Sequence, residues 1–275
     1  MLTLERMIHS LQKLGLNKGD CVLVHSSFKS MGAIEGGADT VIKAFQTVIG
    51  EEGTLVFPTL CSNDWEHVFE NWHLDAPSDV GYLTNYFRKL PGALRSNHAT
   101  HSVAAIGRQA AYITETHGQS GLRYGPFGSA AFSADSPWEK MHALNAKIVM
   151  IGTNFNKSTF CHYVEYCFME DVINRIRTRE DFPQLLEKIW TYGKAFDDCI
   201  WPMIRGSEVQ GVLHERNLLG RCICNNAEVM MVPAQTFCTV SRELLESRYD
   251  NILVPLDDKQ KEIFDWLKKT GIFEI

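Results

Sequence analysis

The first sixty residues alternate between helical and strand-like hydrophobic patterns, and this alternation restricts the fold more than any other feature of the sequence. Apolar residues recur with helical spacing over residues 3–14, and Gly15 follows as a stop signal. The short apolar run Cys21–Val24 predicts a buried strand, and a second helical pattern over 41–49 leads into a second strand at 54–57. Helices that alternate with short buried strands are typical of a parallel sheet covered by helices. The sequence therefore predicts an α/β fold.

The rest of the chain shows no internal repeat, low-complexity tract or linker that would divide it. We therefore expect a single domain over residues 1–275, in which 1–170 hold the motifs and 171–275 add strands and helices to the same fold. The pattern predicts short strands within 206–240 and a final amphipathic helix over 258–269. A hydrophobic content of 45% and a charged content of 22% are ordinary for a globular protein.

The charge and cysteine content exclude several classes of partner. A net charge of −6, from 27 basic and 33 acidic residues, does not suit a nucleic-acid binder but is compatible with a cationic small substrate. No apolar run approaches the ~20 residues of a membrane span, and the N-terminus does not resemble a secretory leader. The eight cysteines form no Cys-x-x-Cys pair. We expect a cytoplasmic enzyme with reduced thiols and no membrane or nucleic-acid partner, either a monomer or a homo-oligomer.

The stretch 157–166 carries the sharpest candidate chemistry. It follows the strand-like run 148–151, and a helix that begins near its start would place Thr159, His162 and Glu165 along one face. A neutral imidazole can take a proton from an amine, while a neighbouring carboxylate fixes its tautomer and a hydroxyl can donate to a developing oxyanion. The alternative is a surface pair one helical turn apart with no catalytic role.

The loop 25–37 follows a strand and precedes a helix, which is the position where α/β folds bind phosphate. Its three serines, its glycines and Lys29 could donate hydrogen bonds to a pyrophosphate. The loop matches neither the Walker pattern nor Gly-x-Gly-x-x-Gly, so an ordinary polar turn is an equally good interpretation.

The segment 95–101 gathers Arg95, His98 and His101 beside a predicted strand. Two histidines at this spacing suggest a metal, but no third ligand follows at a recognisable spacing, so we expect no metal site. Contacts to phosphate or substrate are the better functional interpretation, and a hydrogen-bonded turn is the alternative.

The segment 64–79 is acidic and carries tryptophan, with Asp64, Glu66 and Asp79 among its carboxylates. Carboxylates attract a protonated amine, and aromatic faces cover sugar rings or ammonium groups. The segment could therefore line an acceptor site, although its residue types also fit a solvated surface loop.

Taken together, these motifs resemble the aminoglycoside 3-N-acetyltransferase family, a CoA-dependent group distinct from the GNAT acetyltransferases. The matching pieces occur in family order over about residues 10–170. They are Val24-His25-Ser26-Ser27, Met31-Gly32, Gly36-Gly37-Ala38, the run from Gly53 to Thr59, Phe87-Arg88-x-x-Pro91-Gly92, Arg95-Ser96-x-His98-x-x-His101-Ser102, Ser136-Pro137 and Thr159-x-x-His162-x-x-Glu165-Tyr166.

The resemblance implies a three-layer αβα sandwich around a central, largely parallel or mixed sheet, and direct transfer of an acetyl or short acyl group from acetyl-CoA to an amino sugar without a metal. Carried over by position, His162 is the base, Glu165 its partner and Thr159 a hydroxyl near the thioester carbonyl. The residues expected to contact the acyl-CoA co-substrate are His25, Ser26, Ser27, Lys29, Gly32, His101 and Ser102. Those expected to contact the acceptor are Asp64, Glu66, Asp79 and His98.

Two acceptors remain open. The acidic residues within 61–80 favour a polycationic aminoglycoside, whereas Arg123 and the cluster Arg175, Arg177 and Arg179 favour a nucleotide-linked (dTDP or UDP) deoxyamino sugar. From a different class, Cys161 beside His162 suggests a thioester hydrolase. However, adjacent helical residues project to different faces, which argues against a Cys–His pair. A catalytically silent, CoA-binding relative is the last alternative.

Overall fold

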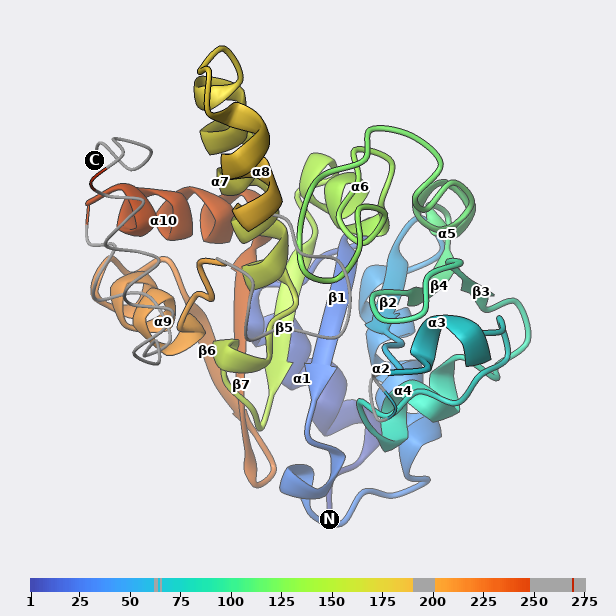
Figure 1. The fold of residues 1–275 in the computed structure, drawn as a ribbon. Coiled ribbons are helices and arrows are strands. Elements are labelled where there is room, and N and C mark those ends of the chain that lie inside the picture. The colour runs from blue at the N-terminus through green and yellow to red at the C-terminus, as the bar shows by residue number, and fades with distance from the viewer. Residues whose placement is uncertain (62–63, 65, 190–200, 248–268, 270–275) are drawn as a thin grey trace.

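The computed structural model describes residues 1–61, 64, 66–189, 201–247 and 269. These residues fold around one seven-stranded sheet, whose strands follow the order β3-β4-β2-β1-β5-β7-β6 (Figure 1). The strands are β1 (Cys21–Ser26), β2 (Thr54–Pro58), β3 (Leu94–Arg95), β4 (Val103–Gly107), β5 (Lys147–Ile151), β6 (Gly220–Cys224) and β7 (Ala227–Pro233). The central strand β1 pairs in parallel with β2 and β5, and all other pairs are antiparallel. The prediction of a mixed sheet is confirmed.

One face of the sheet is covered by helices from the N-terminal part of the chain. They are α1 (Leu4–Leu14), α2 (Ala38–Ile49) and α4 (Tyr82–Phe87). Helix α1 begins where the Thr3 hydroxyl accepts a hydrogen bond from the Arg6 amide, and it ends at Gly15 in a left-handed conformation. The side chains of Val22 and Val24 on β1 point into this layer.

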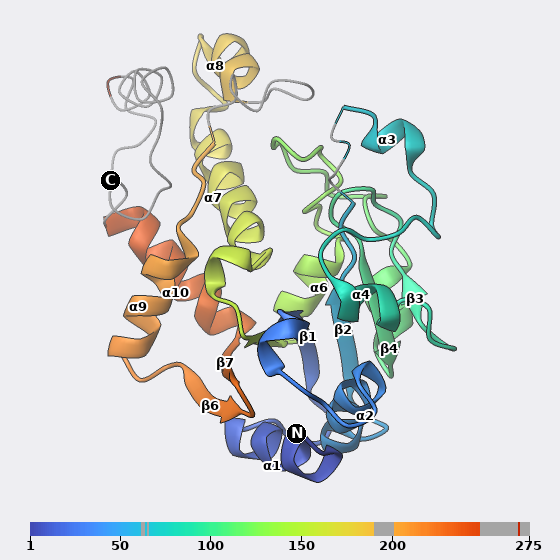
Figure 2. The same cartoon turned by 90° about the horizontal axis from the view of Figure 1, so that it is seen from below.

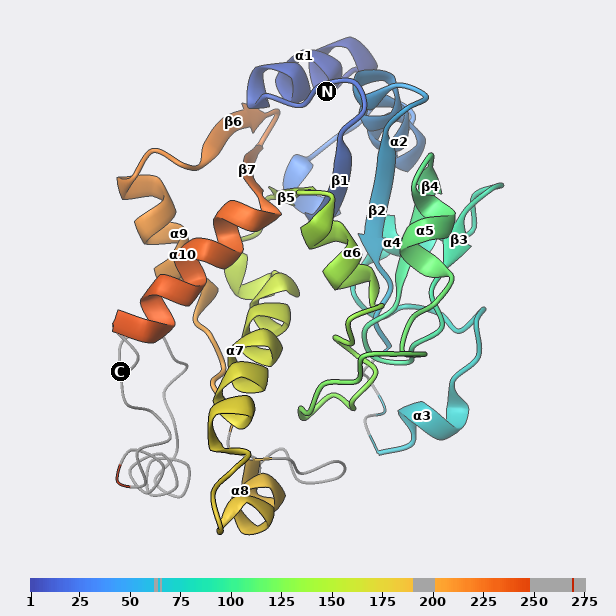
Figure 3. The same cartoon turned by 90° about the horizontal axis from the view of Figure 1, so that it is seen from above.

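The opposite face is covered by helices from the rest of the chain, and Leu23 of β1 points into that layer. These helices are α5 (Ala110–Thr114), α6 (Pro137–Ala143), α7 (Phe160–Ile176), α9 (Gly206–Glu215) and α10 (Ala234–Ser247). Figures 2 and 3 show α1 and α2 on one side of the sheet and α6, α7 and α10 on the other. The predicted αβα sandwich is therefore confirmed.

Two short helices, α3 (Val68–Asn71) and α8 (Phe182–Ile189), project beyond the sandwich (Figures 2 and 3). Two single-turn 3-10 helices, η1 (Phe28–Met31) and η2 (Phe155–Lys157), follow β1 and β5. Within the described ranges, no helix combines the length and the apolar character that crossing a bilayer requires.

The prediction of short strands throughout 206–240 is wrong in part. Only β6 and β7 are strands there, and α9 and α10 flank them. In α10, Phe237, Val240 and Leu244 are buried at a helical spacing, although the two threonines and the valine of this segment favour strands. The helix predicted over 258–269 lies outside the described residues except for Lys269.

Candidate active site

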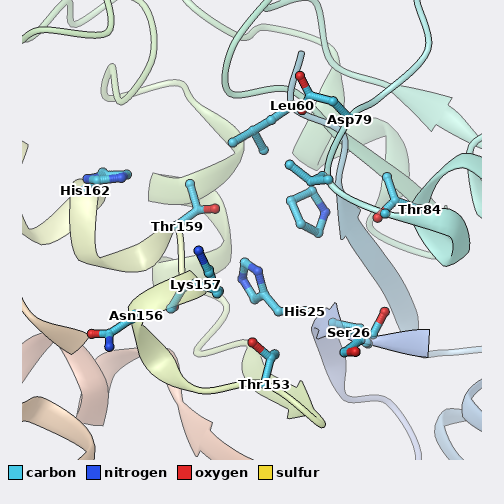
Figure 4. A pocket seen from close by; sticks show the side chains of 16 residues that line it. His25, Ser26, Leu60, Asp79, Thr84, Thr153, Asn156, Lys157, Thr159 and His162 are labelled. Carbon is cyan, nitrogen blue, oxygen red and sulfur yellow. The ribbon is translucent and has the colours of Figure 1, made fainter. Parts of the chain in front are cut away.

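A cavity of about 500 Å³ opens at the carboxyl ends of the three parallel strands, where open α/β sheets bind ligands. Its walls come from the end of β1, the segment after β2, the segment before α4, and the turn between β5 and α7 (Figure 4). The lining residues are Val24, His25, Ser26, Ser27, Pro58, Leu60, Asp79, Val80, Gly81, Thr84, Thr153, Asn156, Lys157, Ser158, Thr159 and His162.

His162 and Glu165 form a hydrogen-bonded pair one turn apart on α7. Nδ1 of His162 lies 2.8 Å from Oε2 of Glu165, whose side chain is fully buried, while His162 remains 26% exposed at the cavity. Because an ionised carboxylate only accepts hydrogen bonds, the proton of a neutral His162 sits on Nδ1. Nε2 then presents its lone pair, and it forms no hydrogen bond within the described part of the chain. The predicted spacing thus yields an oriented imidazole at a cavity.

The Glu165 carboxylate is held by two more donors from residues 201–204. The Trp201 indole donates to Oε2 over 3.0 Å, and the Ile204 amide donates to Oε1 over 2.7 Å. Three N–H groups therefore compensate the buried charge, as a buried carboxylate requires. No local sequence signal indicates these partners, because they lie far along the chain from Glu165 and belong to no recognisable motif.

The turn before α7 contributes Lys157, Ser158 and Thr159 to the cavity. Figure 4 shows Lys157 and Thr159 near His25, with Leu60 and Asp79 across the cavity. The buried Ser158 hydroxyl has no hydrogen-bond partner among the described residues. Ser158 and Lys157 belong to the predicted stretch 157–166, in which only Thr159, His162 and Glu165 were given roles.

Helix α9 supports this turn from behind. The Ser207 amide donates to the side chain of Asn156 over 2.8 Å, and the Phe155 amide donates to Gln210 over 3.3 Å. Gly206 packs directly on the turn, since a Cβ there would lie 2.0 Å from the Phe155 carbonyl oxygen. The position of Lys157 and Ser158 therefore depends on residues beyond 200.

His25 is a buried histidine with an unpaired nitrogen at the cavity. Its side chain is 6% exposed, and Nε2 has no hydrogen-bond partner among the described residues. Burial lowers the pKa of His25 to about 4, so the imidazole is neutral near pH 7. Buried polar atoms in native proteins are normally paired, so His25 and Ser158 can form hydrogen bonds with water or with a ligand in the cavity.

The other predicted CoA residues of the early loop lie in different places. Ser26 and Ser27 line the cavity, whereas Lys29 is exposed on η1 and does not. Gly32 packs against the tip of the β6–β7 hairpin, since a Cβ there would lie 2.7 Å from Nδ2 of Asn226. The structure thus gives Gly32 a packing role.

His101, Ser102 and His98 form a buried layer behind the cavity wall. The Ser102 hydroxyl bonds to Thr59, and His101 bonds to the Thr100 hydroxyl over 2.8 Å while its ring meets His162 edge-on at 6.0 Å. Burial lowers the pKa of His98 and of His101, so both are neutral. None of the three lines the cavity. Among the described residues, no three His, Cys, Asp or Glu side chains are grouped to hold a metal ion.

The predicted acceptor residues separate into two groups. Asp79 lines the main cavity and also a neighbouring cavity of about 350 Å³, which Asp64 and Trp72 line as well. Glu66 is exposed and lines neither cavity. Arg95 holds this region in place, because its guanidinium donates to the carbonyl groups of residues 59, 74 and 76 and lies 4.6 Å from the Trp72 ring centre.

The arginines that favoured a nucleotide-linked sugar, and the cysteine that suggested a thioester hydrolase, lie outside the main cavity. Arg123 donates to Glu139 and Glu170 over 2.7 Å each, and Arg179 pairs with Asp181. Arg175 and Arg177 are exposed, and none of these four arginines lines either cavity. Cys161 is buried, and its thiol contacts the Phe155 carbonyl at 3.5 Å. Burial raises the pKa of Cys161, which makes it a poor nucleophile.

An oriented His–Glu pair, a nearby hydroxyl and a cavity at the parallel strand ends are typical of the active site of an α/β enzyme. Comparison with known sequences identifies the protein family. The chain belongs to the aminoglycoside 3-N-acetyltransferase family, whose model matches residues 23–246. The predicted family and enzyme class are confirmed.

Relatives support this membership along most of the chain. Aminoglycoside N(3)-acetyltransferase III from Salmonella sp is 31% identical over 90% of this chain and 93% of its own length. The YokD protein of Bacillus subtilis (strain 168), an aminoglycoside N(3')-acetyltransferase-like protein, is 32% identical over 63% of this chain and 68% of its own length.

Solved structures share the fold. The apoenzyme of aminoglycoside acetyltransferase AAC(3)-IVa aligns with a TM-score of 0.73 over 95% of this chain and 97% of that chain, at 21% identity. AAC-IIIb in a binary complex with CoASH aligns with a TM-score of 0.69 over 92% of this chain and 98% of that chain, at 18% identity.

Proposed function

We propose that this chain is a CoA-dependent N-acyltransferase that moves an acetyl or short acyl group to a primary amine of an aminoglycoside, with His162 as general base. The observation that carries the proposal is the His162–Glu165 pair at the cavity. The family, the Salmonella relative named for aminoglycoside acetylation, and solved relatives with CoASH or with sisomicin support the two substrates.

The proposed chemistry is direct transfer. When bound, acetyl-CoA supplies the acetyl group as a thioester. Nε2 of His162 accepts a proton from the amine as its nitrogen forms the amide bond, and returns that proton to the sulfur as the carbon–sulfur bond breaks. Glu165 stabilises the transient imidazolium through Nδ1. The Thr159 hydroxyl donates to the carbonyl oxygen, which becomes negative during the attack.

We assign the pantetheine chain of acetyl-CoA to one side of the cavity, which is formed by His25, Ser26, Ser27 and Ser158. The unpaired Nε2 of His25 and hydroxyl of Ser158 suit the amide groups of a pantetheine chain, because both are uncharged and lack partners. Lys157 adds a positive charge to the same cavity, which suits the anionic part of CoA.

We assign the acceptor to the side of the main cavity at Asp79, next to the neighbouring cavity that Asp64 and Trp72 line. Carboxylates beside an aromatic face favour a polycationic amino sugar. A nucleotide-linked amino sugar would need cations for its diphosphate, and the ion pairs of Arg123 leave that alternative less supported. A thioester hydrolase is disfavoured by the burial of Cys161.

The proposal covers residues 1–275 as one acyltransferase domain. It places the protein in the cytoplasm, which the free thiols of the seven described cysteines support.

The deciding experiment is a thiol-release assay with acetyl-CoA across a panel of aminoglycosides and of dTDP- and UDP-linked amino sugars, run on the parent protein and on His162→Ala. We expect release that depends on an aminoglycoside and a loss of about 10²–10⁴-fold in the variant, with acetyl-CoA binding retained. Release that is indifferent to any amine would refute the transferase. Near-normal turnover in the variant would remove His162 from the mechanism.

A further inference from the structure

Two N–H groups converge on one oxygen of the Glu165 carboxylate. Nδ1 of His162 lies 2.8 Å from Oε2, and Nε1 of Trp201 lies 3.0 Å from the same atom. His162 lies on α7, whereas Trp201 comes from the segment before α9. The carboxylate that orients the proposed base is therefore shared with a residue outside every motif of the family resemblance.

The indole is held firmly in this position. Trp201 is 3% exposed, and its ring meets the buried Tyr166 ring at 4.7 Å between centroids in an edge-to-face arrangement. Tyr166 is itself fixed, because its hydroxyl accepts from the Phe127 amide over 2.8 Å and donates to the Gly128 carbonyl. A buried indole N–H without its partner would be costly, so the bond to Glu165 persists.

The other carboxylate oxygen is fixed as well. Oε1 of Glu165 accepts from the Ile204 amide over 2.7 Å. With one fixed donor on each oxygen, the carboxylate group cannot turn about its terminal bond without losing two hydrogen bonds. Its plane, and therefore the direction in which Oε2 faces Nδ1 of His162, is set by residues 201–204.

We infer that Trp201 is a positioning residue for the general base: its indole N–H fixes Oε2 of Glu165 toward His162 and takes up part of the negative charge on that oxygen. This inference rests on the proposed role of His162. A carboxylate oxygen that accepts two hydrogen bonds is a weaker acceptor for each than an oxygen that accepts one. Trp201 thus controls both the direction and the strength of the hydrogen bond at Nδ1.

The test is Trp201→Phe, which keeps an aromatic ring and removes the N–H. We expect kcat to fall about tenfold, because the Glu165 carboxylate loses the donor that sets its direction toward His162, while KM for acetyl-CoA and for the aminoglycoside stays near the parent value. In protein labelled with ¹⁵N-histidine, the Nδ1–H proton resonance of His162 should move downfield, because Oε2 then has one donor instead of two. Its absence in His162→Ala assigns the resonance.

A matched control is Trp138→Phe. Trp138 is also fully buried, and its indole donates over 3.0 Å to the main-chain carbonyl of His101 rather than to Glu165. This variant should lose comparable thermal stability and leave the His162 resonance in place. If Trp201→Phe does not fold, the sulfur isostere 3-benzothienylalanine at position 201 removes the N–H and keeps the shape of the indole.

The outcomes separate the two proposals. Parent-like kcat and an unmoved resonance after loss of the N–H, with His162→Ala inactive, would overturn the role of Trp201 alone. Turnover that survives His162→Ala would overturn the proposed base whatever the result at Trp201.

Discussion

Nδ1 of His162 lies 2.8 Å from Oε2 of Glu165, and the Glu165 carboxylate is fully buried. A buried carboxylate of this kind orients the imidazole and stabilises its charged form. Activity should therefore depend on the charge of Glu165 and on the residues that line the cavity, and stability should depend on the packing around the site.

Replacing Glu165 with glutamine should keep the shape and remove the charge. We expect kcat to fall by about 10²–10⁴-fold, because the amide can no longer stabilise an imidazolium and can impose the wrong tautomer on His162. Steady-state thiol release measures the loss, and calorimetric titration with CoA should show binding close to that of the parent. A Glu165→Gln protein with parent-like kcat would show that the carboxylate has no part in proton transfer.

Neutralising Asp79 should weaken acceptor binding. For Asp79→Asn, we expect KM for a polycationic aminoglycoside to rise about tenfold at low salt, with a smaller difference at high ionic strength, because the lost attraction is electrostatic. The matched control is Glu66→Gln, since Glu66 is exposed and lines neither cavity. Equal changes in both variants would indicate a general charge effect and contradict a specific contact at Asp79.

Two glycines of α9 should respond in opposite directions to alanine. At Gly206 the new Cβ would meet the Phe155 main chain, so we expect a loss of about 1–3 kcal/mol in the free energy of unfolding. At Gly211 nothing lies within 4 Å of the new Cβ, so helix propensity should stabilise the protein by about 0.5–1 kcal/mol. Urea unfolding monitored by tryptophan fluorescence distinguishes them. If both variants changed the free energy of unfolding in the same direction, the result would contradict the close approach of α9 to the turn before α7.

Buried neutral histidines should make the fold sensitive to acid. Burial lowers the pKa of His117 to about 4 from the ordinary 6.5, so the unfolded chain binds a proton that the folded chain does not bind between these values. Stability is complete above pH 6.5 and falls as the pH drops toward 4, by about 3 kcal/mol for this group. His25, His98 and His101 shift in the same direction.

The measurement is the slope of the unfolding free energy against pH between 4.5 and 6.5. His117→Gln should reduce that slope by about 1.4 kcal/mol per pH unit at most, the value for one proton. Ser96→Ala is the control, because it removes the hydroxyl 3.1 Å from Nδ1 of His117 and retains the imidazole. It should lower stability at every pH with little change in slope. A slope that His117→Gln leaves intact would contradict the neutral state of this histidine.

The hydrophobic periodicity of the sequence correctly predicted those helices and strands that depend on neighbouring residues alone. The stripe of α1 with its Gly15 stop, the strand at Cys21 and the spacing of His162 and Glu165 all depend on residues within a few positions of each other. For α10, tertiary packing of Phe237 and Leu244 overrode the strand preference of the residues between them.

The differences between the expected and the observed positions of the site residues have a common physical cause, which is that burial is a property of the whole fold. His101 and Ser102 directly precede β4, whose first residue pairs with the last residue of β2, but their side chains turn inward to Thr100 and Thr59. Sequence spacing cannot show this direction. In the same way, the bond from Trp201 to Glu165 joins segments that lie far apart in the sequence and that only the packing of α9 against η2 and α10 brings together.

The hydrogen bonds from Trp201 and Ile204 to Glu165 also set the length of chain that holds the proposed base pair in place. Every motif of the resemblance ends by about residue 170, yet the carboxylate beside the proposed base is fixed from residues 201–204. A truncated gene product that ends after α7 would keep the whole signature and lose the groups that hold Glu165 in place. When incomplete open reading frames are screened for resistance potential, the signature alone should therefore not be counted as activity. Adding residues 201–247 as a separate polypeptide would be the natural starting point for a split version of this protein.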